Sequence, residues 1–428
     1  RFAATEPVDK ELWYKAPITP MDDLHGNLRG IIEHMDDIQN LGIDVLYMTP
    51  IFQSNSCHKY DTTDYYQIDP SFGTTEDLKE LVQKAHERGM KVVLDAVYNH
   101  TGREFFAFAD ILENGEKSKY RDWYFIDGFP LKSEWGEIPN FKCFGYYGGM
   151  PKLNLKNPEV EKYITDVACY WIKECDIDGW RLDVGDEISH FFWKNFRKAV
   201  KAVKKDLLII GEIWHYAGDF LEGDEWDTVM NYPFYLNLID LLADEKITVS
   251  QFVQNLGYLK GRLNKNCYPL MWNLIDSHDT ARFLHLCNDN KKKQHLAAAF
   301  QLLLPGMPMI YYGDEYAMPG ANDPDCRRGM YWDEEYQDKE MYEWYKRLIQ
   351  VRKSHACIVE GELAGIVTED EEGTIVLIRK NGEETIAMIF NCSSSAKKFN
   401  EYTQKYNLLT ENTFDGNVEG FDAAVIVL

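Results

Sequence analysis

Arg181 and Asp183 form a charged pair in the stretch from Gly179 to Ile188. Residues 177–184 are a short, largely apolar run between polar turns, which predicts a buried strand. Side chains alternate along a strand, so Arg181 and Asp183 share one face while their apolar neighbours take the other. A guanidinium beside a carboxylate lowers the pKa of the acid, and an ionised acid suits a nucleophile. A structural ion pair is the alternative for an isolated pair of this kind.

Three other apolar runs also end in acids and histidines. These side chains are Asp95, Asn99 and His100, then Glu212 and His215, then His278 and Asp279. In a parallel barrel of alternating strands and helices, catalytic side chains collect at the C-terminal ends of the strands, where the loops form one mouth. The sequence therefore predicts that these carboxylates and imidazoles meet in one site.

The composition restricts the possible partners. The chain has 428 residues, 45% of them hydrophobic and 27% charged, and a formal net charge of −24. This charge would repel nucleic acid and an anionic membrane, so we expect neither as a partner. No run approaches the ~20 apolar residues of a membrane span, and the first residues are not a signal peptide.

The cysteines indicate the compartment. There are nine, scattered, with no C-x-x-C pair and no spacing typical of a zinc site. We therefore expect reduced thiols and a cytoplasmic location. Secretion stays open, because the sequence can begin inside a longer chain.

Strands and helices alternate along most of the chain, which predicts a parallel sheet closed by helical crossovers. Strands are expected over 43–51, 91–99, 177–184, 207–214, 228–234, 270–277 and 309–312. Helices are expected over 28–41, 158–175, 189–203, 250–263, 291–304 and 340–354. The fold class is therefore α/β, a TIM-type (β/α)8 barrel whose first strand is apparently absent.

Two segments depart from this alternation. Residues 101–156 lack a regular period and are too long for a simple loop, so they predict a small inserted subdomain between barrel parts at 1–100 and 157–355. From residue 356 to residue 428 the chain changes to apolar runs separated by turns, which predicts a C-terminal antiparallel β-sandwich.

Several motifs resemble the α-amylase family of glycoside hydrolases, and within it the neopullulanase, cyclomaltodextrinase and maltogenic amylase group. They are DAVYNH (95–100), MPKLN (150–154), GWRLDV (179–184), GEIWH (211–215) and IDSHDT (275–280), flanked by HKYDTTDY (58–65) and GMPMIYYGDE (306–315). Their order along the chain is that of the family, and MPKLN resembles the sequence motif that is typical of this group.

The resemblance implies a retaining mechanism. It places the nucleophile at Asp183, the general acid/base at Glu212 and a stabiliser of the transition state at Asp279. A retaining glycosidase needs one carboxylate to attack the anomeric carbon and another to protonate the leaving oxygen, about 5 to 5.5 Å apart. We expect Arg181 to hold Asp183 ionised, and the crowding of acids to keep a proton on Glu212.

The resemblance also implies a set of residues that bind the sugar. They are Tyr60, His100 and His278 at the cleavage point, Asp323 and Arg327 on the non-reducing side, and Glu187 and Trp214 on the leaving-group side, with Arg181 beside the acids. Each has a structural alternative: Tyr60 and Trp214 as ordinary core residues, and Asp323 with Arg327 as a surface ion pair. Asp95 has the alternative role of orienting its neighbours.

Some features depart from the family pattern. In the family an amino-terminal β-domain and the first barrel strand precede an Arg-Phe like Arg1-Phe2, and that domain supports a dimer, so here we expect a monomer or a weak homodimer. The amylases of the family carry a Lys-His for calcium and substrate where this chain has Asp186-Glu187. We therefore expect no metal ligands and no required cofactor, although calcium stays open.

The expected function is hydrolysis of α-1,4 bonds in maltodextrins, with cyclodextrins and pullulan as further candidates and some transfer to sugar acceptors. One alternative is a non-catalytic, amylase-like sugar-binding module, although such relatives lose the acids that this chain keeps. A second alternative is an unrelated barrel that handles phosphorylated metabolites. That reading is disfavoured, because no glycine-rich phosphate loop follows the last strands and the net charge opposes anions.

Overall fold

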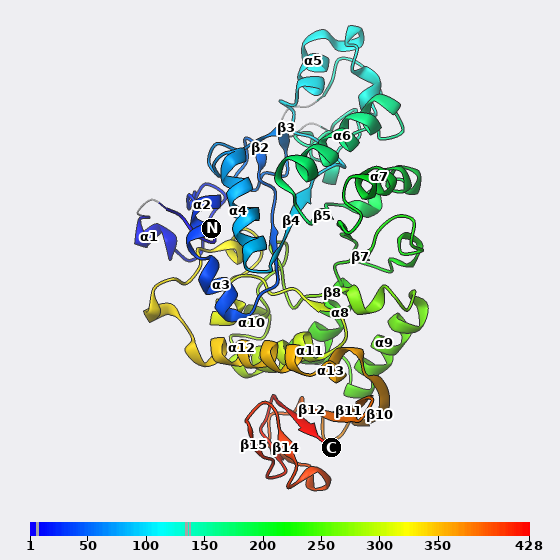
Figure 1. Cartoon of the computed structure of the whole chain (residues 1–428). Helices are drawn as coiled ribbons and strands as arrows, with labels where there is room; N and C mark the ends of the chain where they lie inside the picture. Colours follow the sequence, from blue (N-terminus) through cyan, green and yellow to red (C-terminus); the bar gives the residue numbers. More distant parts are fainter. Residues whose placement is uncertain (6–7, 133–135, 137) are drawn as a thin grey trace.

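The structure is a computed structural model and describes residues 1–5, 8–132, 136 and 138–428. Its centre is a series of short parallel strands surrounded by helices (Figure 1). Five of them pair in the order β1 (Val45–Met48), β4 (Lys91–Ala96), β5 (Gly179–Leu182), β6 (Leu208–Gly211) and β7 (Thr228–Val229). A parallel bridge between Met230 and Trp272 continues the series to β8 (Trp272–Asn273), which pairs with β9 (Met307–Pro308). Together with its helices this series is a TIM-type barrel.

The longer helices lie around the strands where their apolar periodicity predicts them, and shorter helices occur between them (Figure 1). They are α1 (Lys10–Trp13), α2 (Leu28–Glu33), α3 (Met35–Leu41), α4 (Thr75–Glu87), α6 (Pro158–Cys175), α7 (His190–Val203), α8 (Tyr232–Leu238), α9 (Val249–Arg262), α10 (Phe283–Leu286), α11 (Lys291–Leu303) and α12 (Lys339–Ser354). Local signals fix several of the ends. Thr74 and Asp77 form a capping box on α4, and α6 begins at Pro158 with the Asn157 side chain as its N-cap.

Most strands lie inside their predicted ranges but are shorter. Three elements differ more. The helix expected over 28–41 is broken at His34, which has non-helical backbone angles and stacks on Trp332 at 3.6 Å. The strand expected over 228–234 ends at Val229, because Asn231 caps α8 and Pro233 lies in its first turn. The last barrel strand lies at 307–308, before the predicted 309–312. Short apolar runs do not distinguish a strand from a buried helix, which explains the second error.

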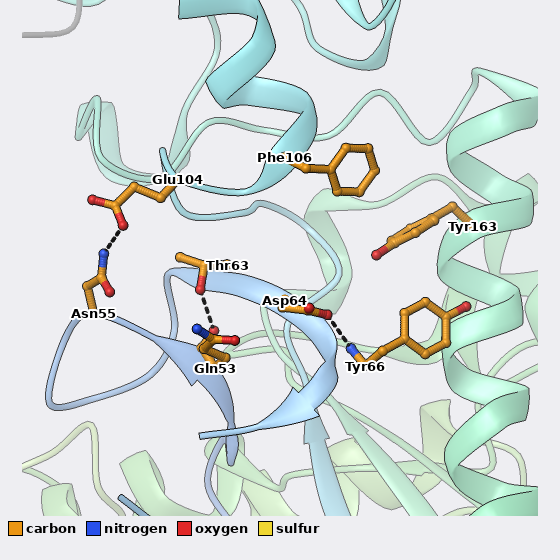
Figure 2. Close-up of a pocket in the computed structure, with 8 residues that line it drawn as sticks. All are labelled: Gln53, Asn55, Thr63, Asp64, Tyr66, Glu104, Phe106 and Tyr163. Atoms are coloured by element: carbon orange, nitrogen blue, oxygen red, sulfur yellow. Dashed lines mark hydrogen bonds between the residues drawn. The ribbon is translucent and has the colours of Figure 1, made fainter. Parts of the chain in front are cut away.

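The segment between β4 and α6 extends the barrel on one side. It contains α5 (Phe106–Asn114), drawn in cyan at the top of Figure 1, and isolated bridges such as Tyr124 with Leu153. The hairpin of β2 (Phe52–Ser54) and β3 (Thr62–Ile68) lies beside it. A surface hollow of about 460 Å³ between the hairpin, α5 and α6 contains none of the predicted site residues (Figure 2).

A C-terminal antiparallel sheet packs on the barrel helices. Its strand order is β10 (Glu362–Glu369), β11 (Thr374–Asn381), β12 (Glu384–Asn391), β17 (Asp422–Val427), β14 (Tyr406–Asn407) and β15 (Asn412–Thr413). A second pair, β13 (Lys397–Lys398) with β16 (Asn417–Val418), covers its outer apolar side, and α13 (Cys357–Glu360) precedes β10. Phe300 of α11 stacks on Phe390 of β12 at 4.3 Å, so the two parts share one core.

No helix among the described residues has both the length and the apolarity that crossing a membrane requires. All nine cysteines are free thiols, and five of them are buried.

Candidate active site

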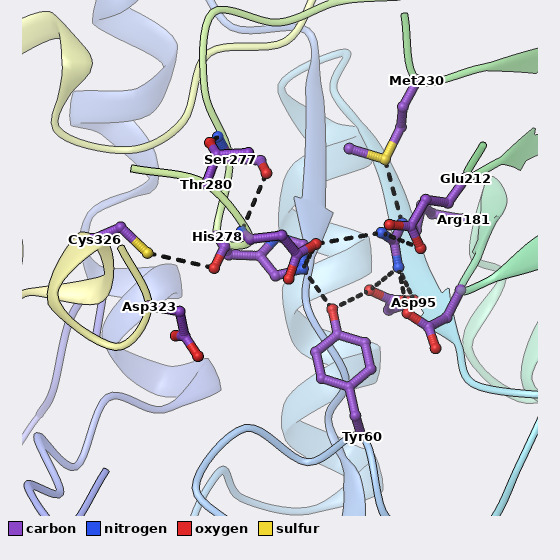
Figure 3. A network of polar contacts seen from close by, with 12 residues as sticks. Tyr60, Asp95, Arg181, Glu212, Met230, Ser277, His278, Thr280, Asp323 and Cys326 are labelled. Atoms are coloured by element: carbon purple, nitrogen blue, oxygen red, sulfur yellow. Dashed lines mark hydrogen bonds and ion pairs between the residues drawn. The ribbon is translucent and has the colours of Figure 1, made fainter. Parts of the chain in front are cut away.

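The fully buried guanidinium of Arg181 is the centre of the polar network in Figure 3. Its Nη1 lies 3.0 Å from Asp183 Oδ1 and 3.2 Å from each carboxylate oxygen of Asp95. Its Nη2 lies 2.9 Å from Glu212 Oε2 and 3.9 Å from Asp279 Oδ2. The three predicted catalytic acids therefore converge on one cation, as the spacing of the motifs predicted.

The parallel ladder explains this convergence. Asp95 on β4 is in register with Arg181 on β5. The ladder continues past the strand ends, because the backbone N–H of Asp183 donates to the Ala96 carbonyl at 3.1 Å and that of Glu212 donates to the Leu182 carbonyl at 3.0 Å. Asp183 and Glu212 are each 7% exposed, whereas the Asp279 side chain is 30% exposed and marks the open side of the site.

Val184 has a backbone conformation that is rare for a β-branched residue. Its φ of 47° and ψ of 43° place it in the left-handed region. In this conformation its N–H donates to Glu212 Oε2 at 2.9 Å. Strain of this kind persists where the surrounding structure holds it, and it is concentrated at functional sites. Nothing in the pattern of residue types signalled this role of Val184.

The pKa of Asp183 shifts in the direction opposite to the prediction. Burial and the neighbouring Glu212 raise it well above its usual value, although Arg181 acts in the opposite direction. The expected net lowering of this pKa by Arg181 is therefore wrong, because burial outweighs the guanidinium. Glu212 accepts from Val184 and also from Trp214 Nε1 at 3.0 Å.

Two tyrosines bind Asp95, and one of them, Tyr60, connects it to His278. Asp95 Oδ2 accepts from Tyr47 at 2.7 Å and from Tyr60 at 3.0 Å. The Tyr60 hydroxyl also lies 2.6 Å from His278 Nε2, which in turn lies 3.1 Å from Asp279 Oδ2. Burial lowers the pKa of His278 well below 6.5, so its ring is neutral and its Nε2 carries the hydrogen. Asp95 is fully engaged in holding Arg181 and the tyrosines, and sequence reasoning missed Tyr47.

His100 lies at the edge of the inserted segment. Its Nε2 lies 3.1 Å from the Tyr60 carbonyl, and its ring stacks on Phe144 at 5.2 Å. Burial lowers the pKa of His100 to about 4, so the ring is neutral at physiological pH. The single N–H of the neutral ring therefore donates to the Tyr60 carbonyl, and the neighbouring Phe144 was not predicted.

Trp214 and Glu187 lie on the side of the site formed by the loops after β5 and β6. Trp214 is 41% exposed, stacks on Tyr232 at 3.8 Å and donates to Glu212. Glu187 pairs with Lys152 at 2.7 Å and accepts from Asn99 at 3.2 Å. Trp214 is therefore an exposed aromatic platform beside an acid, and its alternative as a core residue is wrong.

Asp323 and Arg327 lie beside the loop that carries His278 and Asp279, here called the catalytic loop. Arg327 Nε lies 2.7 Å from Asp323 Oδ1 and donates to the His278 carbonyl at 2.8 Å. Its Nη2 lies 3.5 Å from Asp279 Oδ1. The pair is therefore more than a surface ion pair, because Arg327 contacts both residues of the catalytic loop, while Asp323 remains half exposed.

Within the described residues, no group of three or more histidine, cysteine, aspartate or glutamate side chains is arranged to hold a metal ion. Asp186, at the position where amylases of the family carry a calcium contact, lies 3.2 Å from His215.

Comparison with known proteins places this fold and site in a family. The model of the α-amylase catalytic domain matches residues 1–361. The chain belongs to the α-amylase family, and it is a glycoside hydrolase.

Individual relatives within the family have named activities. The chain is 47% identical over 400 residues to a cyclomaltodextrinase of Geobacillus thermopakistaniensis, and the aligned part covers 92% of this chain and 68% of the relative. It is 43% identical over 371 residues to an intracellular maltogenic amylase of Bacillus subtilis, covering 86% and 62%. Among solved structures, the cyclic α-maltosyl-(1→6)-maltose hydrolase of Arthrobacter globiformis superposes with a TM-score of 0.91 at 34% identity, covering 100% and 96%.

Proposed function

We propose that this protein hydrolyses α-1,4-glucosidic bonds of maltodextrins with retention of configuration, and that cyclodextrins and pullulan are further substrates. The observation that carries the proposal is the convergence of Asp183, Glu212 and Asp279 on Arg181 at the open end of the barrel. The named activities of the relatives support the substrate class.

The first step of the proposed reaction forms a covalent intermediate. Glu212 gives a proton to the leaving glycosidic oxygen while an Asp183 oxygen attacks the anomeric carbon, so the carbon–oxygen bond to the leaving sugar breaks as the bond to Asp183 forms. This step requires that Glu212 carries a proton and that Asp183 is ionised when the substrate is bound. Arg181 contacts both acids and therefore remains paired with a carboxylate wherever the proton resides.

The second step releases the sugar. A water molecule attacks the anomeric carbon, Glu212 takes its proton, and the ester bond to Asp183 breaks. Asp279 lies nearest the open side and stabilises the positive charge that develops on the sugar ring in both steps. Replacement of the water by a sugar hydroxyl gives the proposed transfer reaction.

Neutral side chains position the sugar in this proposal. His100 and His278 contact the sugar at the cleavage point, and the Tyr60 ring is the surface for stacking. Trp214 and Glu187 bind the leaving group, while Asp323 and Arg327 bind the next sugar on the non-reducing side. None of these steps needs a cofactor. A chelator should therefore leave turnover unchanged, and a loss that calcium restores would contradict this part.

We also propose a cytoplasmic location and a monomer or weak homodimer. The free cysteines and the intracellular relative support the location. Neither nucleic acid nor a membrane is a proposed partner, because the charge of −24 opposes both.

The test is a product time course with the anomeric form resolved. The substrates are maltotriose, maltoheptaose, β-cyclodextrin, pullulan and cyclic α-maltosyl-(1→6)-maltose. We expect initial products in the α configuration from the first three substrates. Initial β products would contradict retention, and no turnover by a folded protein would contradict the enzyme assignment. The last substrate tests whether α-1,6 bonds are also cut.

A further inference from the structure

A second buried arginine lies behind the loop that carries His278 and Asp279. Arg282 is fully buried; its Nη1 lies 3.0 Å from Asp314 Oδ1, and its Nε donates to the Cys326 carbonyl at 3.0 Å. Its backbone N–H donates to the Gly320 carbonyl at 3.0 Å, and its guanidinium lies 4.0 Å from the centre of the Tyr311 ring. Arg282 therefore joins the catalytic loop to the segments that follow β9.

A second carboxyl completes this cluster. Asp276 Oδ2 accepts from the backbone N–H of Phe283 at 2.7 Å, and Asp276 and Asp314 are close enough to act on each other's pKa. Asp276 Oδ1 and Asp314 Oδ2 are buried and have no hydrogen-bond partner among the described residues. Ionised carboxylates are acceptors only. A proton on one of the two carboxyl groups would supply the donor that both of these oxygens lack.

The surrounding charges agree with one proton. The ionisable side chains that face the pair are Arg282, Glu315, Tyr235, Tyr311, Tyr312, Tyr345 and Cys326. Arg282 is the sole cation in this set, so it balances one negative charge. Burial raises the pKa of Glu315 to about 7, and burial raises the pKa of both Asp276 and Asp314. A second unbalanced negative charge here would be strongly disfavoured.

The cluster is connected to the catalytic machinery by short paths. Cys326, whose carbonyl binds Arg282, directs its Sγ to the His278 carbonyl at 3.4 Å. The next residue, Arg327, donates to the same carbonyl and contacts Asp279. Displacement of Arg282 would therefore move the residues that position His278 and Asp279.

We propose that Asp276 and Asp314 share one proton and, together with Arg282, act as positioning residues that hold the catalytic loop from the side opposite the substrate. None of the three side chains contacts Asp183, Glu212 or Asp279. Their contribution is indirect, and it depends on a proton that stays bound at neutral pH.

The first test is infrared spectroscopy of the full chain at pH 8, where the carbonyl stretch of a protonated carboxylic acid is separate from carboxylate bands. Asp276→Asn and Asp314→Asn each replace the shared proton by an amide N–H in a group of nearly the same shape. Difference spectra against the wild type should show loss of one acid band in each variant. Asp183→Asn is the matched control, because it removes a buried acid of the other arginine cluster and should alter a different band. No lost acid band in either cluster variant would overturn the proposal.

The second test is proton linkage. A carboxyl pair whose pKa is raised on folding contributes stability that is present at low pH and is lost as the pH rises through the folded-state value. Between pH 5 and 8 the unfolding constant of the wild type should therefore rise with pH by up to about tenfold per pH unit more than that of Asp314→Asn. Parallel profiles would contradict a shared proton.

The third test separates positioning from general stability. Asp276→Ala, assayed well below its own unfolding temperature, should lower kcat at least about fivefold with a smaller change in KM, while Asp276→Asn should stay within about twofold of the wild type. An Ala variant as active as the wild type would remove the positioning role. If Asp276→Ala does not fold, Asp314→Ala takes its place. The two Asn variants still test the shared proton, because their infrared spectra and unfolding profiles are compared with those of the wild type.

Discussion

Arg181 and Arg282 are both fully buried and both face more carboxyl groups than one guanidinium can balance, yet their surroundings differ. The acids around Arg181 lie at the ends of barrel strands, and one of them, Asp279, is 30% exposed. The acids around Arg282 are each 1% exposed, and aromatic rings cover the guanidinium. The chemistry of the two clusters is alike, and access to a substrate is what makes one of them catalytic.

The largest expected difference between the clusters is in turnover. Glu212→Gln removes the proton donor and should lower kcat by about 10²- to 10⁴-fold, because general acid/base catalysis contributes about that much. Asp183→Asn should lower it at least as far. Circular dichroism should show that both variants keep the wild-type fold. Near-normal turnover in either would contradict the proposed roles, and Asp276→Asn is the matched variant that should remain active.

The next difference is in stability. Arg282→Met leaves a buried carboxyl pair without its cation and should lower the free energy of unfolding by about 3–5 kcal/mol, measured by denaturant titration. Lys353→Met is the control, because its ion pair with Asp44 lies at the surface and should contribute about 1 kcal/mol or less. Equal losses in the two variants would mean that Arg282 is not held as the contacts indicate.

A smaller effect separates the two tyrosines of the catalytic cluster. Tyr60→Phe removes hydrogen bonds to Asp95 and His278, whereas Tyr47→Phe removes only the hydrogen bond to Asp95. Each lost hydrogen bond should raise the barrier by about 1 kcal/mol, so kcat/KM should fall by about tenfold or more in Tyr60→Phe and by less in Tyr47→Phe. A larger fall in kcat/KM for Tyr47→Phe than for Tyr60→Phe would mean that the contact between Tyr60 and His278 does not contribute to catalysis.

The smallest expected effect is on stability. The stability that His295 contributes changes with pH in the direction opposite to that of the carboxyl groups around Arg282. Burial lowers the pKa of His295 to about 4, so the folded state stays neutral where the unfolded chain takes up a proton. This group contributes stability above pH 6.5 that is lost as the pH falls toward 4. His295→Gln should therefore reduce the loss of stability on acidification, followed by thermal unfolding at several pH values, with unchanged turnover at pH 7. An unchanged acid profile would contradict the buried neutral state.

The sequence predicted the alternation of strands and helices, because long amphipathic helices such as α6 and α7 carry strong periodicity and clear caps. It also placed Asp183, Glu212 and Asp279 in one site, since parallel strands deliver their ends to one side. Short elements were harder: the break at His34 depends on its contact with Trp332, which is distant in sequence.

The parts of the site that could not be predicted come from backbone geometry and distant contacts. Val184 directs its N–H at Glu212 because of its left-handed backbone, and no residue type indicates that conformation. Asp276 lies three residues before Asp279 in the same motif, yet one faces Asp314 in the interior and the other faces the open site. The net pKa shift of Asp183 depends on burial, which the sequence does not give.

The nucleophile can be identified directly by trapping it. Glu212→Gln, incubated with an α-maltosyl fluoride whose leaving group needs no proton, should accumulate a glycosyl-enzyme, because the second step lacks its base. Proteolysis and mass spectrometry should place one maltosyl unit on the peptide that contains Asp183, and the double variant with Asp183→Asn should carry none. A maltosyl unit on Asp279, or rapid turnover that releases β-maltose without an adduct, would contradict the assignment of Asp183 as the nucleophile of a retaining α-glucan hydrolase.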